Sequence, residues 1–159
     1  MITLLSRKVD YALLILSHLH ERQHQGQSAR EIAERFSLSK AFIANILKEL
    51  CQKGFVVSQR GVKGGYVLQR PADQIHFTDL LEQLEEGFRI AECTHTEGEE
   101  RPACTLEHQC PIRTPMMQIH RRMMKVFQGL TLAELFADIV DTNVNFPSRL
   151  QLLPATATI

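Results

Sequence analysis

The sequence predicts a mainly α-helical protein with one small β-hairpin, and three observations support this fold class. Two short helices with polar N-caps follow each other closely within residues 28–54. A glycine-rich, basic turn lies between two β-prone stretches in residues 55–68. A long helix with an apolar face is predicted over residues 115–129. The 159 residues suffice for one domain of ordinary size, or for a small domain with an extension.

The N-terminal elements follow from local signals. Residues 9–20 are mostly apolar and predict a largely buried helix. Ser28, with Glu31 three residues later, forms a capping box that begins the next helix. Ser39 is a good N-cap for a further helix, whose apolar residues recur at helical spacing. We expect that helix to end at Gly54, because glycine adopts the left-handed conformation without strain.

The hairpin completes a recognisable arrangement. Residues 55–60 and 66–68 flank the tip sequence Gly61-Val62-Lys63-Gly64-Gly65. Two helices joined by a tight turn and followed by a basic hairpin are typical of a winged helix-turn-helix. Its second helix enters the DNA major groove, so the sequence predicts a DNA-binding module over residues 28–68.

The charge distribution agrees with double-stranded DNA as the partner. Residues 1–70 have a net charge of +6 and residues 71–159 a net charge of −6, although the whole chain is neutral. Exposed side chains of the second helix can reach base edges, and an arginine on the wing can enter a minor groove. We expect a dimer that binds a palindromic operator. The candidate DNA-binding residues are Ser28, Ser39, Lys40, Ala41, Phe42, Asn45, Arg60 and Lys63.

The C-terminal half is predicted in less detail. Thr78 is a candidate cap for a short helix over residues 79–87. Thr131 and Glu134 form a capping box for a last helix that ends near Val140. The predicted organisation is a winged helix-turn-helix domain (1–75), a region with a cysteine loop and long helices (76–142), and a flexible tail (143–159).

Three cysteines, Cys93, Cys104 and Cys110, lie within eighteen residues. No apolar run could span a bilayer and no secretory signal is evident, so we expect a cytoplasmic protein in which disulfides are disfavoured. An iron–sulfur cluster suits soft thiolates at wide spacing. A structural zinc site with His95 or His108 as fourth ligand, and free redox thiols, are the alternatives. Cys51 lies apart and is interpreted as a small buried residue.

The chain resembles the IscR and NsrR family of bacterial iron–sulfur transcription regulators over residues 1–140. The wing motif Arg60-Gly61-Val62-Lys63-Gly64-Gly65-Tyr66-Val67-Leu68 and the cysteine loop together carry most of the resemblance. Further matching features are Asp10-Tyr11-Ala12-Leu13, Ser39 through Leu50, Pro71-Ala72 and Thr131-Leu132-Ala133-Glu134-Leu135.

The resemblance implies a homodimer whose long helix, here residues 113–129, crosses its partner. That gives a role to the apolar face formed by Met116, Ile119, Met123, Val126 and Phe127. It also implies a [2Fe–2S] or [4Fe–4S] cluster bound by Cys93, Cys104 and Cys110.

The family resemblance leaves the fourth cluster ligand open. In the NsrR-like branch an aspartate of the partner's first helix serves, and Asp10 occupies that position. In the IscR-like branch a histidine three residues after the last cysteine serves, but Arg113 stands there. The ten residues between Cys93 and Cys104 exceed the usual family spacing, so His95 and His108 remain alternatives.

The function predicted from the sequence is transcription regulation, with DNA affinity controlled by a cluster that senses iron, redox state or nitric oxide. One alternative is a zinc-stabilised or thiol-switched repressor. Another, of a different class, is an iron–sulfur carrier or electron-transfer protein. No catalytic motif is evident, and Lys63-Gly64-Gly65 lies between strands rather than before a helix, so we expect no enzyme activity.

Overall fold

The computed structural model describes residues 5–23, 25–61, 64–85, 88–94, 104–106 and 109–141. This part of the chain is mainly helical with one two-stranded antiparallel hairpin, which confirms the predicted fold class. None of its helices is long and apolar enough to cross a membrane. In chain order the elements are α1 (Arg7–Glu21), α2 (Ala29–Phe36), α3 (Lys40–Gln52), β1 (Val56–Gln59), β2 (Gly65–Leu68), η1 (Ala72–Gln74), α4 (Phe77–Leu84), α5 (Arg113–Gln128) and α6 (Leu132–Asp141).

Side-chain caps begin the helices of the winged part at the predicted residues. The backbone N–H of Ser28 donates to the Glu31 carboxylate at 2.7 Å, and the N–H of Glu31 donates to Ser28 Oγ at 3.2 Å. Hydrogen bonding from Ser28 to the Glu31 carboxylate, first of all from the backbone N–H, lowers the pKa of this carboxyl. Ser39 Oγ accepts from the N–H of Phe42 at 3.2 Å. Each cap satisfies an N–H group that has no partner inside its helix, which confirms the predicted starts of α2 and α3.

The prediction that Thr78 caps a helix over residues 79–87 is wrong. The helix begins at Phe77 and ends at Leu84, so Thr78 is a buried residue of its first turn. The cap position is His76, whose N–H donates to the Asp79 carboxylate at 3.4 Å. His76 also forms an isolated β-bridge with Thr131, which ties the start of α4 to the start of α6.

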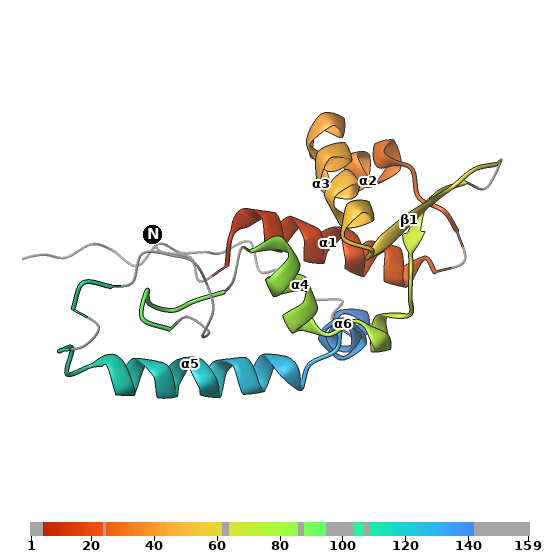
Figure 1. Cartoon of the computed structure of the whole chain (residues 1–159). Helices are drawn as coiled ribbons and strands as arrows, with labels where there is room; N and C mark the ends of the chain where they lie inside the picture. The colour runs from red at the N-terminus through yellow and green to blue at the C-terminus, as the bar shows by residue number, and fades with distance from the viewer. Residues whose placement is uncertain are drawn as a thin grey trace, which may run out of the picture.

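Helix α1 lies at the centre of the molecule. Figure 1 shows α2, α3 and the hairpin on one side of α1, and α4, α5 and α6 on the other. One cluster of buried apolar residues runs from Val9 in α1 through Leu47 in α3 and Leu80 in α4 to Phe136 in α6. The two parts of the chain on either side of residue 75 therefore share a core, and the division into domains stays a prediction.

The hairpin is anchored to the segment before α2. Strands β1 and β2 pair with Val56 opposite Leu68 and Gln59 opposite Gly65. Beyond this ladder, Tyr66 and Gln27 exchange two backbone hydrogen bonds of 2.8 and 3.1 Å. Gly65 has φ +145°, and a Cβ there would lie 2.6 Å from the backbone nitrogen of Gln27. Only glycine fits this close approach, so the attachment of the wing to Gln27 requires glycine at position 65.

Candidate nucleic-acid interface and cysteine loop

Helix α3 presents the predicted polar side chains to solvent. Ser39, Lys40, Ala41 and Asn45 are all exposed, while the opposite face of the helix, including Leu47, is buried. The turn before α3 passes through Ser37, which ends α2 in the left-handed conformation with φ +55°. An exposed lysine and asparagine on one helix can make hydrogen bonds with phosphates and base edges.

The side chain of Phe42 on α3 is partly covered by α1. Its ring packs edge-to-face on Tyr11 of α1, with ring centroids 4.8 Å apart and an interplanar angle of 84°. The side chain remains 38% exposed. Beside this pair lies a groove of about 410 Å³ between α1 and α3. The residues that line the groove are Arg7, Lys8, Tyr11, Phe42, Asn45, Ile46 and Glu49.

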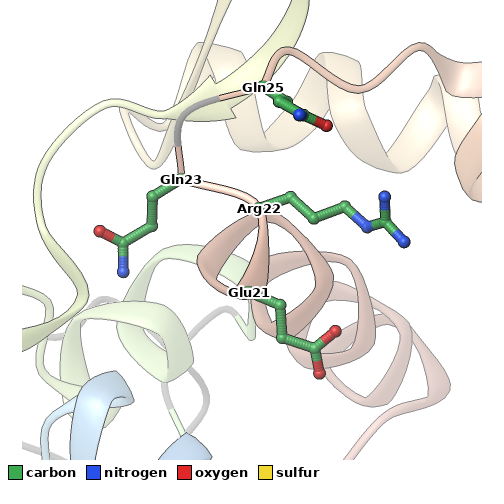
Figure 2. A pocket seen from close by; sticks show the side chains of 4 residues that line it. All are labelled: Glu21, Arg22, Gln23 and Gln25. Atoms are coloured by element: carbon green, nitrogen blue, oxygen red, sulfur yellow. The ribbon is translucent and has the colours of Figure 1, made fainter.

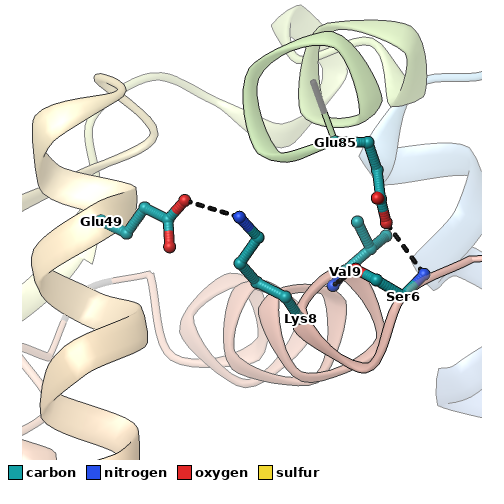
Figure 3. Close-up of polar contacts among 5 residues, drawn as sticks. All are labelled: Ser6, Lys8, Val9, Glu49 and Glu85. Carbon is teal, nitrogen blue, oxygen red and sulfur yellow. Dashed lines mark hydrogen bonds and ion pairs between the residues drawn. The ribbon is translucent and has the colours of Figure 1, made fainter. Parts of the chain in front are cut away.

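The three groove residues from α1 were not predicted from the sequence. Nothing in the local pattern of α1 shows that its first turns lie beside α3, because this neighbourhood depends on the packing of two helices. The ion pair between Lys8 Nζ and Glu49 Oε1, 3.0 Å long, bridges the two helices (Figure 3).

The wing places Arg60 at the end of β1, where the side chain is exposed. Gly61 follows with φ +125°, a conformation that glycine adopts without strain. Lys63, the other predicted wing residue, lies outside the described residues. Ser28 caps α2 and is half-buried, so the geometry gives it a structural role in addition to the predicted contact with DNA.

A buried histidine lies behind the wing and was also missed from the sequence. His18 Nε2 lies 3.2 Å from Gln27 Oε1, and this hydrogen bond is buried. Because the amide oxygen can only accept, the histidine is the donor. Burial lowers the pKa of His18, although the hydrogen bond that it donates to Gln27 opposes this effect. The pair thus connects α1 to the segment before α2 that pairs with Tyr66 of β2.

A polar hollow of about 410 Å³ lies at the end of α1 and is lined by Glu21, Arg22, Gln23 and Gln25. Figure 2 shows that Arg22 and Gln23 extend in opposite directions. These side chains do not converge on one point, so we assign no ligand to this hollow.

The cysteine loop is described at its two ends. Cys93 is buried, and a turn fixes its neighbourhood because Thr94 Oγ1 donates to the carbonyl of Ala91 at 2.7 Å. Cys104 and Cys110 are half-buried, and all three cysteines are free thiols. The carbonyl of Cys110 accepts from the N–H of Arg113, so this cysteine directly precedes α5. His95 and His108 lie outside the described residues.

The thiol donors fit an iron–sulfur cluster chemically, since such clusters are held by thiolates. However, the described part of a single chain brings no three His, Cys, Asp or Glu side chains close enough to hold a metal ion. Asp10 is exposed in the first turn of α1 and is therefore accessible to another molecule. Cys51, predicted as a small buried residue, is half-buried against the core, and burial raises the pKa of its thiol.

Helix α5 and the residue before it carry a seam of apolar residues that are exposed in the described part of the chain. The helix has no buried residue. Ile112, Ile119 and Val126, spaced by seven, are 59%, 48% and 61% exposed. Of the other predicted interface residues, Met116 is half-buried, and Met123 and Phe127 pack against the core of their own chain.

The capped helix pair, the exposed face of α3 and the anchored basic hairpin define a winged helix-turn-helix DNA-binding protein. The family Rrf2, described as iron-dependent transcriptional regulators, matches residues 5–138, and the chain belongs to this family. The sequence-based identification is thus confirmed.

Individual relatives agree with the family assignment. The transcriptional regulator NsrR of Oceanobacillus iheyensis is 34% identical over 109 residues, which cover 65% of this chain and 74% of that protein. Protein aau3 of Rhizobium meliloti is 30% identical over 131 residues, covering 82% and 83%. The structure of CymR, the global cysteine regulator of B. subtilis, superposes with a TM-score of 0.67 at 27% identity, covering 87% of this chain and 98% of that one.

The IscR structure of T. potens has a TM-score of 0.66 at 23% identity, over 87% and 90% of the two chains, and supports the fold. The family and its regulator relatives act in transcription and not as enzymes. The protein is accordingly a DNA-binding transcriptional regulator of the Rrf2 family.

Proposed function

We propose that this regulator is a homodimer whose affinity for a palindromic operator is controlled by an iron–sulfur cluster. The observation that carries the proposal is that the core of the DNA-binding module extends to Phe88 and Ile90, directly before a loop with three free thiols. The description of the family as iron-dependent supports iron as the metal.

The proposed cluster ligands are Cys93, Cys104 and Cys110, with Asp10 of the partner subunit as the fourth. His95 and His108 are the alternatives for that fourth position. When bound, the cluster would supply an iron centre that can be lost, oxidised or nitrosylated. With Asp10 of the partner subunit as a ligand, the site would be shared between two subunits.

Helix α1 is the proposed link between the cluster loop and DNA. Asp10 lies two residues from Lys8, which pairs with Glu49 on α3. The N–H of Ser6 donates to Glu85 at the end of α4, at 2.8 Å (Figure 3). If the cluster gained or lost its bond to Asp10, α1 would move and α3 would move with it. DNA affinity changes only if the states of the cluster place the two recognition helices differently.

The proposed DNA contacts are Lys40, Ala41, Phe42 and Asn45 on α3 with Arg60 and Lys63 on the wing; Ser28 and Ser39 add contacts at the helix starts. Asn45 suits a bidentate contact to adenine, and Arg60 a narrow minor groove. The exposure of Lys40, Asn45 and Arg60 supports this assignment.

The proposed dimer forms through the seam of α5. Exposed apolar residues spaced by seven, with Met116 and Met123 four residues after Ile112 and Ile119, follow the pattern of helices that pack along one another. A second copy of α5 would cover this seam.

The test is anaerobic purification followed by iron and sulfide counts and an absorbance spectrum. We expect iron and sulfide in the protein, and absent in a variant with Cys93, Cys104 and Cys110 changed to Ala. Cys51→Ala is the matched control and should retain the cluster. Operators selected from a random duplex library should bind the cluster-loaded and cluster-free proteins with different affinities, and the triple variant should lose this difference.

Purified protein without iron, sulfide or visible absorbance would contradict the cluster. The result would then favour a thiol switch, the second candidate, which the likeness to the cysteine regulator CymR and the three free thiols support. That candidate predicts operator binding that changes with thiol oxidation in the absence of any metal. Zinc at about one per chain would favour the zinc-stabilised form.

A further inference from the structure

We propose that the groove between α1 and α3 binds the DNA phosphate backbone, with Arg7 as its main cation and Tyr11 as a neutral hydrogen-bonding group. The inference rests on the proposed function, because it extends the DNA interface from α3 onto the first turns of α1. None of the DNA contacts predicted from the sequence lies on α1.

The position of the groove is the first argument. Phe42 and Asn45, two of the candidate DNA-binding residues, are also part of its lining. The major groove of DNA is about 12 Å wide and a helix with its side chains about 10–12 Å across, so phosphates lie on both flanks of an inserted helix. The flank of α3 that faces α1 therefore needs a surface that accepts a phosphate.

The charge of the groove is the second argument. Lys8 is held by Glu49, and this pair contributes no net charge to the groove. Arg7 is exposed, and among the described residues it forms no ion pair. A guanidinium that no carboxylate neutralises can form the planar, bidentate contact that phosphates accept.

The rigidity of the groove is the third argument. The rings of Tyr11 and Phe42 pack edge-to-face with centroids 4.8 Å apart, and Lys8 Nζ on α1 lies 3.0 Å from Glu49 Oε1 on α3. The two walls therefore keep a fixed spacing. A phosphate-binding site formed by two packed helices would position α3 along the duplex without reading the base sequence.

The test compares Arg7→Gln with Arg122→Gln, which removes the same charge from an exposed site on α5. Figure 1 shows α5 on the far side of α1 from α3. Binding is measured at several salt concentrations to a mixed-sequence duplex of about three helical turns and to a selected operator. Arg7→Gln should weaken both by roughly tenfold per dimer and reduce the salt slope by about 2, one phosphate contact per subunit. Arg122→Gln should leave both unchanged.

A second variant, Tyr11→Phe, keeps the packing against Phe42 and removes only the hydroxyl, and it should weaken binding to both duplexes a few-fold. The proposal is overturned if the wild-type protein binds DNA while Arg7→Gln has the affinity and salt slope of Arg122→Gln. Arg7-dependent thermal stabilisation by inorganic phosphate, with DNA affinity unchanged, would assign the groove to a small anion instead. A wild-type protein that binds neither duplex would contradict the DNA-binding function itself.

Discussion

His18 illustrates how a single side chain joins separate segments of this fold. Its ring is buried, donates to Gln27 and packs edge-to-face against Phe36 with centroids 5.5 Å apart. A buried imidazole is stable only while it is neutral, unless a negative partner compensates the charge. The histidine therefore makes the attachment of α1 to the wing segment sensitive to protonation.

We expect stability to fall when the pH drops below about 6.5, the ordinary histidine pKa. Because burial lowers the pKa of His18 in the folded protein, the unfolded chain takes up this proton first. The free energy of unfolding should therefore decrease more between pH 7.5 and 5.5 for the wild type than for His18→Gln. Urea unfolding at both pH values measures the difference. Equal decreases in the two proteins would show that the protonation of His18 does not differ between the folded and unfolded states.

The wing shows how an element depends on its attachment. Gly65 and Gly61 both have positive φ, but their surroundings differ. A Cβ on Gly65 would meet the backbone of Gly26 and Gln27 at 2.6 Å, whereas at Gly61 no described atom lies within 4 Å. Substitution of Gly61 therefore tests backbone strain alone, whereas substitution of Gly65 tests strain together with a steric clash.

Gly65→Ala should lower the free energy of unfolding by about 2–4 kcal/mol, because strain and a clash with rigid backbone combine. Gly61→Ala, which adds strain alone, should cost about 1 kcal/mol. Denaturant unfolding measures both values, and Gly65→Ala should also weaken DNA binding because the wing loses its anchor. Similar losses in the two variants would contradict a role for the contact with Gln27.

Local chemistry explains which elements could be predicted. The starts of α2 and α3 depend on hydroxyl groups that bond three residues ahead, so the sequence is sufficient. The start of α4 combines a local bond, from the His76 N–H to the Asp79 carboxylate, with a bridge from His76 to Thr131, fifty-five positions away, and the sequence pattern does not show that bridge. The groove lining from α1 was missed because the pairing of α1 with α3 has no local signal.

At the scale of the whole molecule, α5 is the element whose packing a single chain leaves incomplete. A 16-residue helix without a buried side chain gains little stability from its own chain. Its inner side still contacts the core, since Phe127 packs edge-to-face on Phe77 and Phe88, with centroids 5.2 and 5.5 Å away. The outer seam is therefore held in a fixed orientation for a partner.

Ile119→Glu combined with Val126→Glu should convert the proposed dimer to a monomer, because it buries charge in an apolar seam. Sedimentation analysis should give half the mass, and operator affinity should fall because the two half-sites lose their linkage. Gln118→Glu is the control, since it adds a charge at an exposed position of the same helix. A double variant that remains a dimer would show that the subunits associate elsewhere.

The helix starts with hydroxyl caps, the glycine-rich hairpin, the three thiols and the family assignment can all be predicted from the amino-acid sequence. These features arise from residues close in the chain or from residue type alone. The tertiary structure decided which distant residues meet: His18 with Gln27, Lys8 with Glu49, and Ser6 with Glu85 across 79 positions. Such contacts form only when the core brings α1 against its neighbours, and their energies depend on burial and geometry that no local pattern specifies.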